Sequence, residues 1–108
     1  MDNIKNDEYY ISKIKENLNF IVKHMENTER NDFDKNELLQ DSMSFRLIQI
    51  SEDSKKLTEE YRANNSHIPW NDIFGLRNRI VHDYGNVDLS IVFDTLKNDI
   101  PEVFNLIK

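Results

Sequence analysis

The sequence predicts an all-α protein, an up-and-down helical bundle of four to five helices whose last helix is kinked at Pro101. Only two glycines and two prolines occur in its 108 residues. Because these residues break helices, their scarcity favours a helical chain. Apolar residues recur at spacings of three and four along most of the chain, which is the period of an amphipathic helix. At this length we expect a single domain over residues 1–108 with one modest core.

Composition narrows the functional class. The chain has no cysteine, which excludes disulfides and thiolate metal sites and favours a reducing compartment. No run approaches the roughly 18 consecutive apolar residues of a membrane span, and no signal peptide is recognised, so we expect a cytoplasmic protein without a membrane partner. The net charge of −6 disfavours loose binding along a nucleic-acid backbone. Any contact with RNA therefore has to come from a local cationic site.

The first helix is predicted from Asp7 to Glu26, followed by a polar link over residues 27–32. Its apolar stripe consists of Ile11, Ile14, Leu18, Ile21, Val22 and Met25. These side chains fall on one helical face, so we expect them to enter the core.

The second helix is predicted to run to about Ala63, roughly 45 Å in all. Asp34 and Glu37 resemble a capping box at its start, and Phe33 could staple onto Leu38. An alternating four–three pattern predicts a seam for a bundle or a dimer; it consists of Leu39, Met43, Leu47, Ile50, Ser54, Leu57 and Tyr61. A second apolar line, Leu38, Phe45 and Ile48, predicts that this helix packs on two sides.

The third helix is predicted to follow a turn over residues 64–68, to open at Pro69-Trp70 and to end with a left-handed cap at Gly85. Within it, Arg79 can pair with Asp83 across one helical turn, and we interpret that pair as structural.

Two features of the third helix are unusual for a plain packing helix. On an ideal helical wheel Arg77 falls within the apolar stripe, and a desolvated guanidinium needs a carboxylate, a phosphate or an opening to water. Gly75 lies one heptad before His82, where a mid-helix glycine costs about 1 kcal/mol against alanine. Close approach of another backbone or a ligand would explain this glycine. A snorkelling arginine, a solvated histidine and a tolerated glycine are the alternative.

The fourth helix is predicted to begin at a cap formed by Asp88. One helical phase continues straight through Pro101, carried by Leu89, Val92, Phe93, Leu96, Ile100, Val103, Phe104 and Ile107. A kink is therefore expected there instead of a stop, with Asp99 able to cap a new start.

The chemistry available to this chain is limited. It has no glycine-rich phosphate loop and no His/Cys metal cluster, so we expect no cofactor. What remains is Arg77, Asn78, His82 and Tyr84. RNA carries its own nucleophile, the ribose 2′-hydroxyl; a histidine can transfer the proton, and an arginine can hold the phosphate and stabilise the charge growing on its oxygens.

The spacing of these residues has consequences for assembly. Arg77 and His82 lie about 140° apart on a straight helix, so two copies meeting across a two-fold axis could share a cleft that one helix cannot form alone. Asn78 lies four residues before His82 and can hydrogen-bond its imidazole, although an ordinary surface pair is equally open. Glu52 is the candidate to neutralise or orient Arg77, with a plain surface carboxylate as its alternative.

The residues from Arg77 to Tyr84 have the form R-x4-H-x-Y, and they follow Pro69-Trp70-x-x-Ile73-x-Gly75-Leu76. This arrangement resembles the signature of the HepT-like HEPN domains, the toxin halves of bacterial toxin–antitoxin pairs. The stretch Arg46–Glu52 resembles that family's second helix, although the family usually has Gly-Glu-Ala where this chain has Ser51-Glu52-Asp53.

The resemblance implies a metal-independent endoribonuclease with its active site at a homodimer interface. It implies RNA as substrate, with Arg77 and His82 as catalytic residues. It also implies that Tyr84 is where a partner nucleotidyltransferase, the antitoxin, attaches AMP and silences the toxin. A non-catalytic helical dimer that binds a nucleotide or protein partner is the alternative, and the acidic charge of the chain favours it.

Overall fold

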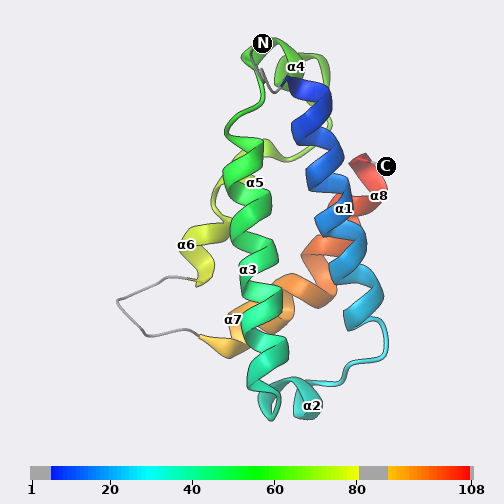
Figure 1. The fold of residues 1–108 in the computed structure, drawn as a ribbon, viewed down its shortest axis with the longest axis vertical. Helices are drawn as coiled ribbons and strands as arrows, with labels where there is room; N and C mark the ends of the chain where they lie inside the picture. Colours follow the sequence, from blue (N-terminus) through cyan, green and yellow to red (C-terminus); the bar gives the residue numbers. More distant parts are fainter. Residues whose placement is uncertain (1–5, 81–87, 108) are drawn as a thin grey trace, which may run out of the picture.

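The structure is a computed structural model that describes residues 6–80 and 88–107. Throughout these residues the regular structure is helical, which confirms the predicted all-α class. The two longest helices, α1 (Asp7–Met25) and α3 (Glu37–Ser54), lie side by side and run in opposite directions (Figure 1). On its other side α3 packs against two short helices, α5 (Trp70–Phe74) and α6 (Leu76–Ile80). The helix packs on two sides, as predicted, although two of the three residues that predicted it, Leu38 and Phe45, are exposed.

Helix α1 matches its predicted range to within one residue. The Asn6 side-chain oxygen accepts a hydrogen bond from the Tyr9 backbone N–H at 3.0 Å, which caps the first turn. The predicted stripe is buried at Ile11, Ile14, Leu18, Ile21 and Met25, with Val22 packed at its edge. The N-terminal half of the fold therefore follows directly from local pattern.

The second predicted helix is wrong in its boundaries, because the chain forms a separate short helix before it and breaks it after Ser54. A short helix α2 (Arg30–Asp34) comes first, with a capping box between Glu29 and Asp32. Helix α3 is then capped by the side chain of Asn36, which accepts from the Leu39 N–H at 2.9 Å. The Asp34–Glu37 box is thus replaced by two other caps.

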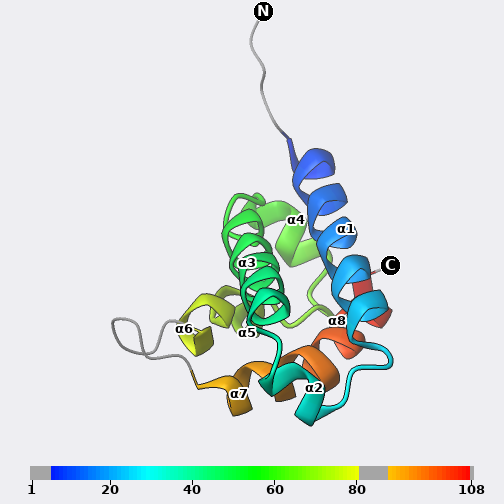
Figure 2. The same ribbon diagram turned by 60° about the horizontal axis from the view of Figure 1, so that its bottom comes forward.

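The predicted hydrophobic staple is also wrong. Leu38 is 81% exposed, whereas Phe33 is fully buried and meets Phe93 at 5.5 Å between ring centroids. This contact joins α2 to α7 (Leu89–Asp94) at one end of the bundle (Figure 2). Phe33 therefore packs against the distant Phe93 ring instead of against Leu38, its neighbour in the sequence.

Helix α3 ends at Ser54, and α4 (Glu59–Asn64) begins after a turn. Thr58 caps α4, and both its N–H and its hydroxyl donate to the Asp7 carboxylate, at 2.8 and 2.7 Å. Tyr61 of α4 meets Trp70 edge-on at 6.3 Å between ring centroids. Burial, followed by the nearby charge of Asp7, raises the pKa of the Tyr61 hydroxyl above its ordinary value. Contacts with α1 and α5 thus fix a segment predicted to continue straight.

The four–three seam of the second predicted helix packs inside the chain's own helical bundle. Met43, Leu47, Ile50 and Ser54 are completely buried in the chain's own core, so they are not open to a partner. In the second apolar line Ile48 is half-buried, while Leu38 and Phe45 are exposed.

The third predicted helix is interrupted at Gly75, which separates α5 from α6. Pro69 precedes α5 as its N-cap. A Cβ added at Gly75 would meet only the carbonyl oxygens of Asn71 and Asp72, both at 3.6 Å and within its own helical turn. The expected close approach of another backbone is therefore wrong within the described chain. The predicted cap at Gly85 lies outside the described residues.

The C-terminal helix is continuous through Pro101, as predicted. Asp88 caps α7 by accepting from the N–H groups of Ser90 and Ile91, at 3.0 and 3.3 Å. A π-helical turn, η1 (Thr95–Asp99), leads into α8 (Ile100–Ile107), and the ribbon bends there (Figure 1). The wider turn lies where the missing Pro101 N–H would interrupt an α-helix. Asp99 caps no new start, because its carboxylate pairs with another helix.

The Asp88 cap gives a direct test of this helix start. Asp88→Ala should lower the free energy of unfolding by about 1 kcal/mol, because two N–H groups lose their acceptor. Asp88→Asn should restore most of the loss, since asparagine caps as well as aspartate. Asp94→Ala removes the same charge from an exposed position of the same helix and serves as the control in urea unfolding. Equal losses for both alanine variants would contradict the cap.

Candidate active site

The described part of the R-x4-H motif lies on α6. This helix packs against α3 and α7, and the residues that follow Ile80 lie outside the described part of the chain (Figure 1). Arg77 and Asn78 are both exposed on it. His82 and Tyr84, with Asp83, lie outside the described residues. The structure therefore describes the surroundings of Arg77 and Asn78 only.

Arg77 faces outward, which corrects its predicted place on the apolar stripe. Its side chain is 54% exposed, whereas the buried positions of α5 and α6 are Trp70, Ile73, Leu76 and Ile80. A single helical wheel fails here because the interruption at Gly75 separates the two helices. The guanidinium is open to solvent and to an incoming phosphate.

Glu52 of α3 is the carboxylate beside Arg77. Its Oε1 lies 3.8 Å from Arg77 Nε, and its side chain is 44% exposed. An exposed pair at this distance contributes little to stability, so it leaves the guanidinium available to a stronger partner. The contact expected between these two residues is present, and the role of Glu52 in catalysis stays a prediction.

The neighbouring arginine, Arg79, forms an ion pair with the C-terminal helix. Its Nη1 lies 2.6 Å from Oδ2 of Asp99 and 3.5 Å from the Thr95 hydroxyl. The predicted pairing with Asp83 lies outside the described residues, and the structure shows this longer-range partner instead. The ion pair ties α6 to the π-turn of the C-terminal helix.

A second tie holds the start of α6 to α3. The Ser51 hydroxyl donates to the Phe74 carbonyl at 2.8 Å, next to the Gly75 interruption. Ser51 is completely buried, so its hydroxyl needs a partner within the protein. The hydroxyl therefore satisfies a carbonyl at the end of α5 and fixes where α6 begins.

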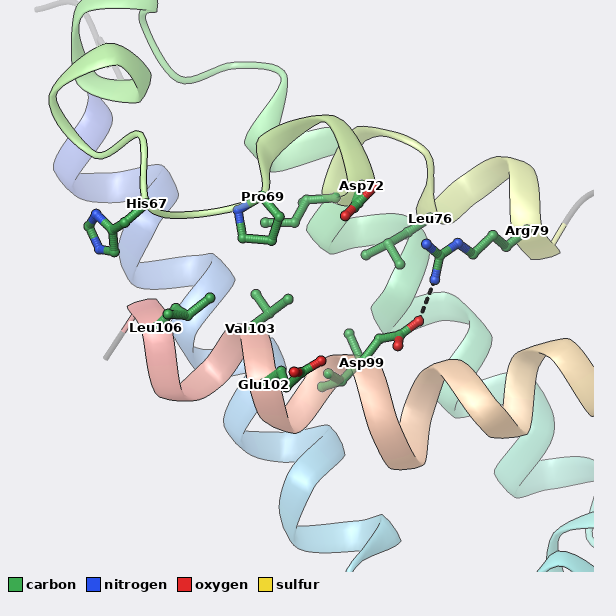
Figure 3. Close-up of a pocket in the computed structure, with 11 residues that line it drawn as sticks. His67, Pro69, Asp72, Leu76, Arg79, Asp99, Glu102, Val103 and Leu106 are labelled. Atoms are coloured by element: carbon green, nitrogen blue, oxygen red, sulfur yellow. Dashed lines mark hydrogen bonds and ion pairs between the residues drawn. The ribbon is translucent and has the colours of Figure 1, made fainter.

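A pocket of about 340 Å³ lies between the segment from His67 to Arg79 and the C-terminal helix. Its apolar floor comes from Ile73, Leu76, Ile100 and Val103, while Asp72, Asp99 and Glu102 line it beside Arg79 and His67 (Figure 3). Three carboxylates against one arginine repel a phosphate. Arg77, Asn78 and Glu52 do not line it, so the pocket and the motif are separate features.

Two searches of the described residues bear on other functional classes. Within residues 6–80 and 88–107, no three His, Asp or Glu side chains come together as a metal site. None of the helices described there combines the length and the apolar character that crossing a membrane requires.

A small helical domain that presents an arginine beside a carboxylate, at the start of an R-x4-H motif, has the features of the HEPN class. A protein-family model described as "Ribonuclease HepT-like" matches residues 14–108. The chain belongs to the HepT-like ribonuclease family and is a ribonuclease-type HEPN protein.

Curated relatives agree with this assignment. The chain is 29% identical over 105 residues to a protein of Caldanaerobacter subterraneus subsp. tengcongensis that is provisionally named an RNase; the match covers 97% of this chain and 94% of the relative. It is 30% identical over 94 residues to a provisionally named RNase of Methanocaldococcus jannaschii, covering 87% and 78%. A protein of Thermococcus cleftensis named "Probable ribonuclease HepT" is 32% identical over 54 residues, covering 50% and 49%. No solved structure matches the chain.

The sequence analysis missed the residues that position α6. Arg79 and Asp99 are 20 residues apart, and no local pattern pairs them. Ser51 and Phe74 are likewise 23 residues apart, beyond the reach of any local pattern.

The two arginines of α6 should separate cleanly in stability measurements. Arg77→Ala should change the free energy of unfolding by no more than about 0.5 kcal/mol, as expected for an exposed side chain. Arg79→Ala should cost about 1 kcal/mol, because it leaves Asp99 without its partner. A double-mutant cycle with Asp99→Ala in urea unfolding should show coupling of at least about 0.5 kcal/mol. A larger loss for Arg77→Ala would return that arginine to a structural role.

Proposed function

We propose that this protein is the toxin of a bacterial toxin–antitoxin pair, a metal-independent endoribonuclease with its active site at a homodimer interface. The observation that carries the proposal is the exposed Arg77 guanidinium, 3.8 Å from a partly exposed Glu52, on the motif of a chain that belongs to the HepT-like family. The cytoplasm is the compartment we expect.

In the proposed reaction the RNA supplies its own nucleophile. The ribose 2′-oxygen attacks the adjacent phosphorus while its proton passes to a base, and the leaving 5′-oxygen takes up a proton. His82 is assigned these proton transfers, for which a group titrating near neutral pH is suited. Arg77 is assigned the phosphate, because a guanidinium can hold two of its oxygens and stabilise the charge that develops on them.

Two supporting residues complete the assignment. Glu52 orients the Arg77 guanidinium and is displaced from it, or shares it, when a phosphate arrives. Asn78 hydrogen-bonds the His82 imidazole and fixes its tautomer. Their positions on α3 and α6 are compatible with these roles, since both side chains lie at least partly on the surface beside Arg77.

The homodimer is proposed because one protomer does not provide the whole site. Arg77 faces outward from α6, so a second copy could meet it across a two-fold axis and supply His82. Exposed apolar side chains are available for such a contact, including Leu38 of α3 and Ile91 of α7, which are 81% and 46% exposed. The buried seam of α3 plays no part in it.

The catalytic assignment predicts two inactive but folded variants. Arg77→Ala and His82→Ala should each abolish RNA cleavage and any growth arrest, while the midpoint of thermal unfolding stays near that of the wild type. Gel analysis of a labelled RNA, with and without EDTA, measures the activity. Cleavage by the wild type should persist in EDTA.

Two results would refute this scheme. Loss of wild-type cleavage on chelation would assign the reaction to a metal. Full activity of Arg77→Ala would remove the guanidinium from the reaction. The matched control is Arg30→Ala, which removes an arginine with a 47% exposed side chain from α2, outside the motif, and should leave cleavage unchanged.

Control of the toxin is assigned to Tyr84. In the proposal a nucleotidyltransferase antitoxin attaches AMP to the Tyr84 hydroxyl. On a continuous helix Tyr84 would lie seven residues beyond Arg77 and within about 20° of it. The added phosphate would then pair with the guanidinium that otherwise holds the RNA phosphate, since arginine–phosphate pairs are strong and directional.

The modification is tested by intact-mass spectrometry after incubation with ATP and a nucleotidyltransferase encoded by a gene next to that of this protein. Wild type should gain one or more AMP units and lose ribonuclease activity. Tyr84→Phe should gain none and should stay active, because the phenol has no proton-transfer role in the scheme. AMP on another residue, or a silenced Phe variant, would remove the assignment of Tyr84 and leave the ribonuclease proposal standing.

A further inference from the structure

A groove of about 260 Å³ lies between α1 and α3, apart from the pocket of Figure 3. Aromatic and cationic side chains alternate along it: Tyr9, Tyr10, Lys13, Phe45, Arg46 and Lys56. None of them belongs to the motif on α6. The groove is therefore a separate candidate for the local cationic site that an acidic ribonuclease needs.

Two aromatic side chains of the groove are exposed to solvent. Phe45 is 60% exposed and Tyr9 is 39% exposed. The Tyr9 ring is held edge-on against Tyr10, with 5.2 Å between centroids and 85° between planes. Exposed rings of this kind are platforms on which unpaired bases stack, irrespective of sequence.

Two lysines stand beside these rings. Lys13 Nζ lies 5.9 Å from the centroid of Tyr9, and Lys56 Nζ lies 5.6 Å from that of Tyr10. Both lysines are exposed, so they can contact a phosphate while the rings take the bases. Arg46 is fixed deeper in the groove, because its Nη1 donates to Asn17 at 2.7 Å and its guanidinium lies 3.7 Å from the Phe20 centroid.

The two carboxylates of the groove do not close it to an anion. Asp53 is only 4% exposed and accepts a hydrogen bond from Gln49 at 3.2 Å. Glu16 lies 3.7 Å from Lys13 in an exposed pair, which is weak enough for a phosphate to displace. Two exposed lysines therefore face solvent against one exposed carboxylate.

We propose that this groove binds single-stranded RNA, with bases stacked on Tyr9 and Phe45 and phosphates held by Lys13 and Lys56. The inference rests on the proposed ribonuclease function and assigns that enzyme a substrate-binding surface outside its motif. Helix α3 connects the two places: Phe45 and Glu52 are one heptad apart on the same helical line, about 10 Å along the axis, and Glu52 contacts Arg77. A strand lying in the groove would reach the catalytic arginine across that distance.

Fluorescence anisotropy with a short, labelled 2′-O-methyl RNA tests the groove, because this probe lacks the 2′-hydroxyl nucleophile and cannot be cleaved. Phe45→Ala should weaken binding roughly 5- to 150-fold, the effect of losing one stacked base. Phe45→Tyr should retain the affinity. Lys13→Gln with Lys56→Gln should flatten the plot of log affinity against log salt by about 0.7 for each lysine. A duplex probe should bind more weakly than the single strand.

Two matched controls lie outside the groove. Lys15→Gln removes an exposed lysine about 200° around α1 from Lys13, and Leu106→Ala removes an exposed apolar side chain of α8 that does not line the groove. Both should bind the probe like the wild type. Sedimentation of every variant should show an unchanged assembly state.

Three outcomes are distinguishable. Wild-type affinity in both groove variants, with RNA still cleaved by the wild type, would overturn the groove and leave the ribonuclease proposal intact. A Phe45→Ala protein that changes its assembly state, beside a lysine variant that binds normally, would assign this face to a second copy of the chain. A wild type that neither binds the probe nor cleaves RNA would overturn the proposed function itself.

Discussion

The position of Arg77 depends on how α6 is held against the rest of the bundle. Helices in proteins take most of their stability from tertiary packing, and the described residues of α6 make several such contacts. Burial of Leu76 and Ile80 fixes its inner face. The Arg79–Asp99 pair ties it to the C-terminal helix, and the Ser51–Phe74 hydrogen bond ties its start to α3. The exposed Arg77 side chain, to which we assign the RNA phosphate, is thus positioned by contacts of its buried and half-buried neighbours.

The same arrangement reconciles an acidic protein with an RNA substrate. At a net charge of −6 the molecule as a whole does not attract a polyanion. The pocket beside Arg79 follows this overall character, since three carboxylates line it. The groove between α1 and α3 departs from it by placing Lys13 next to the exposed Tyr9 ring and Lys56 next to the half-buried Tyr10 ring. Stacking on rings depends little on net charge, so a local site of this kind suits an acidic ribonuclease.

Apolar spacing and capping residues predicted those parts of the fold that depend on contacts between residues close together in the sequence. The stripe of α1, the Asp88 cap and the continuous phase through Pro101 were all predicted, because each depends on residues within a few turns. The breaks after Ser54 and at Gly75 were not predicted. The first depends on Asp7 binding Thr58 from 51 residues away, and the second sets the phase that turns Arg77 outward.

The candidate site was predictable to the same extent. The motif identified Arg77 and suggested Glu52, and the structure brings these two side chains together. Tertiary contacts alone assign Arg79 to a structural pair and assemble the aromatic and cationic groove from two helices. Single residues of that groove look like ordinary surface positions in the sequence. Their common face emerges only when α1 and α3 are packed.

The central claim is that two copies of the chain share one cleft, with Arg77 from one protomer and His82 from the other. Mixing the inactive variants Arg77→Ala and His82→Ala under subunit exchange tests it directly. Random pairing makes half of the dimers mixed, and each mixed dimer has one intact site, so cleavage should return to about a quarter of the wild-type rate. A mixture that stays inactive although mixed dimers form would contradict the shared cleft.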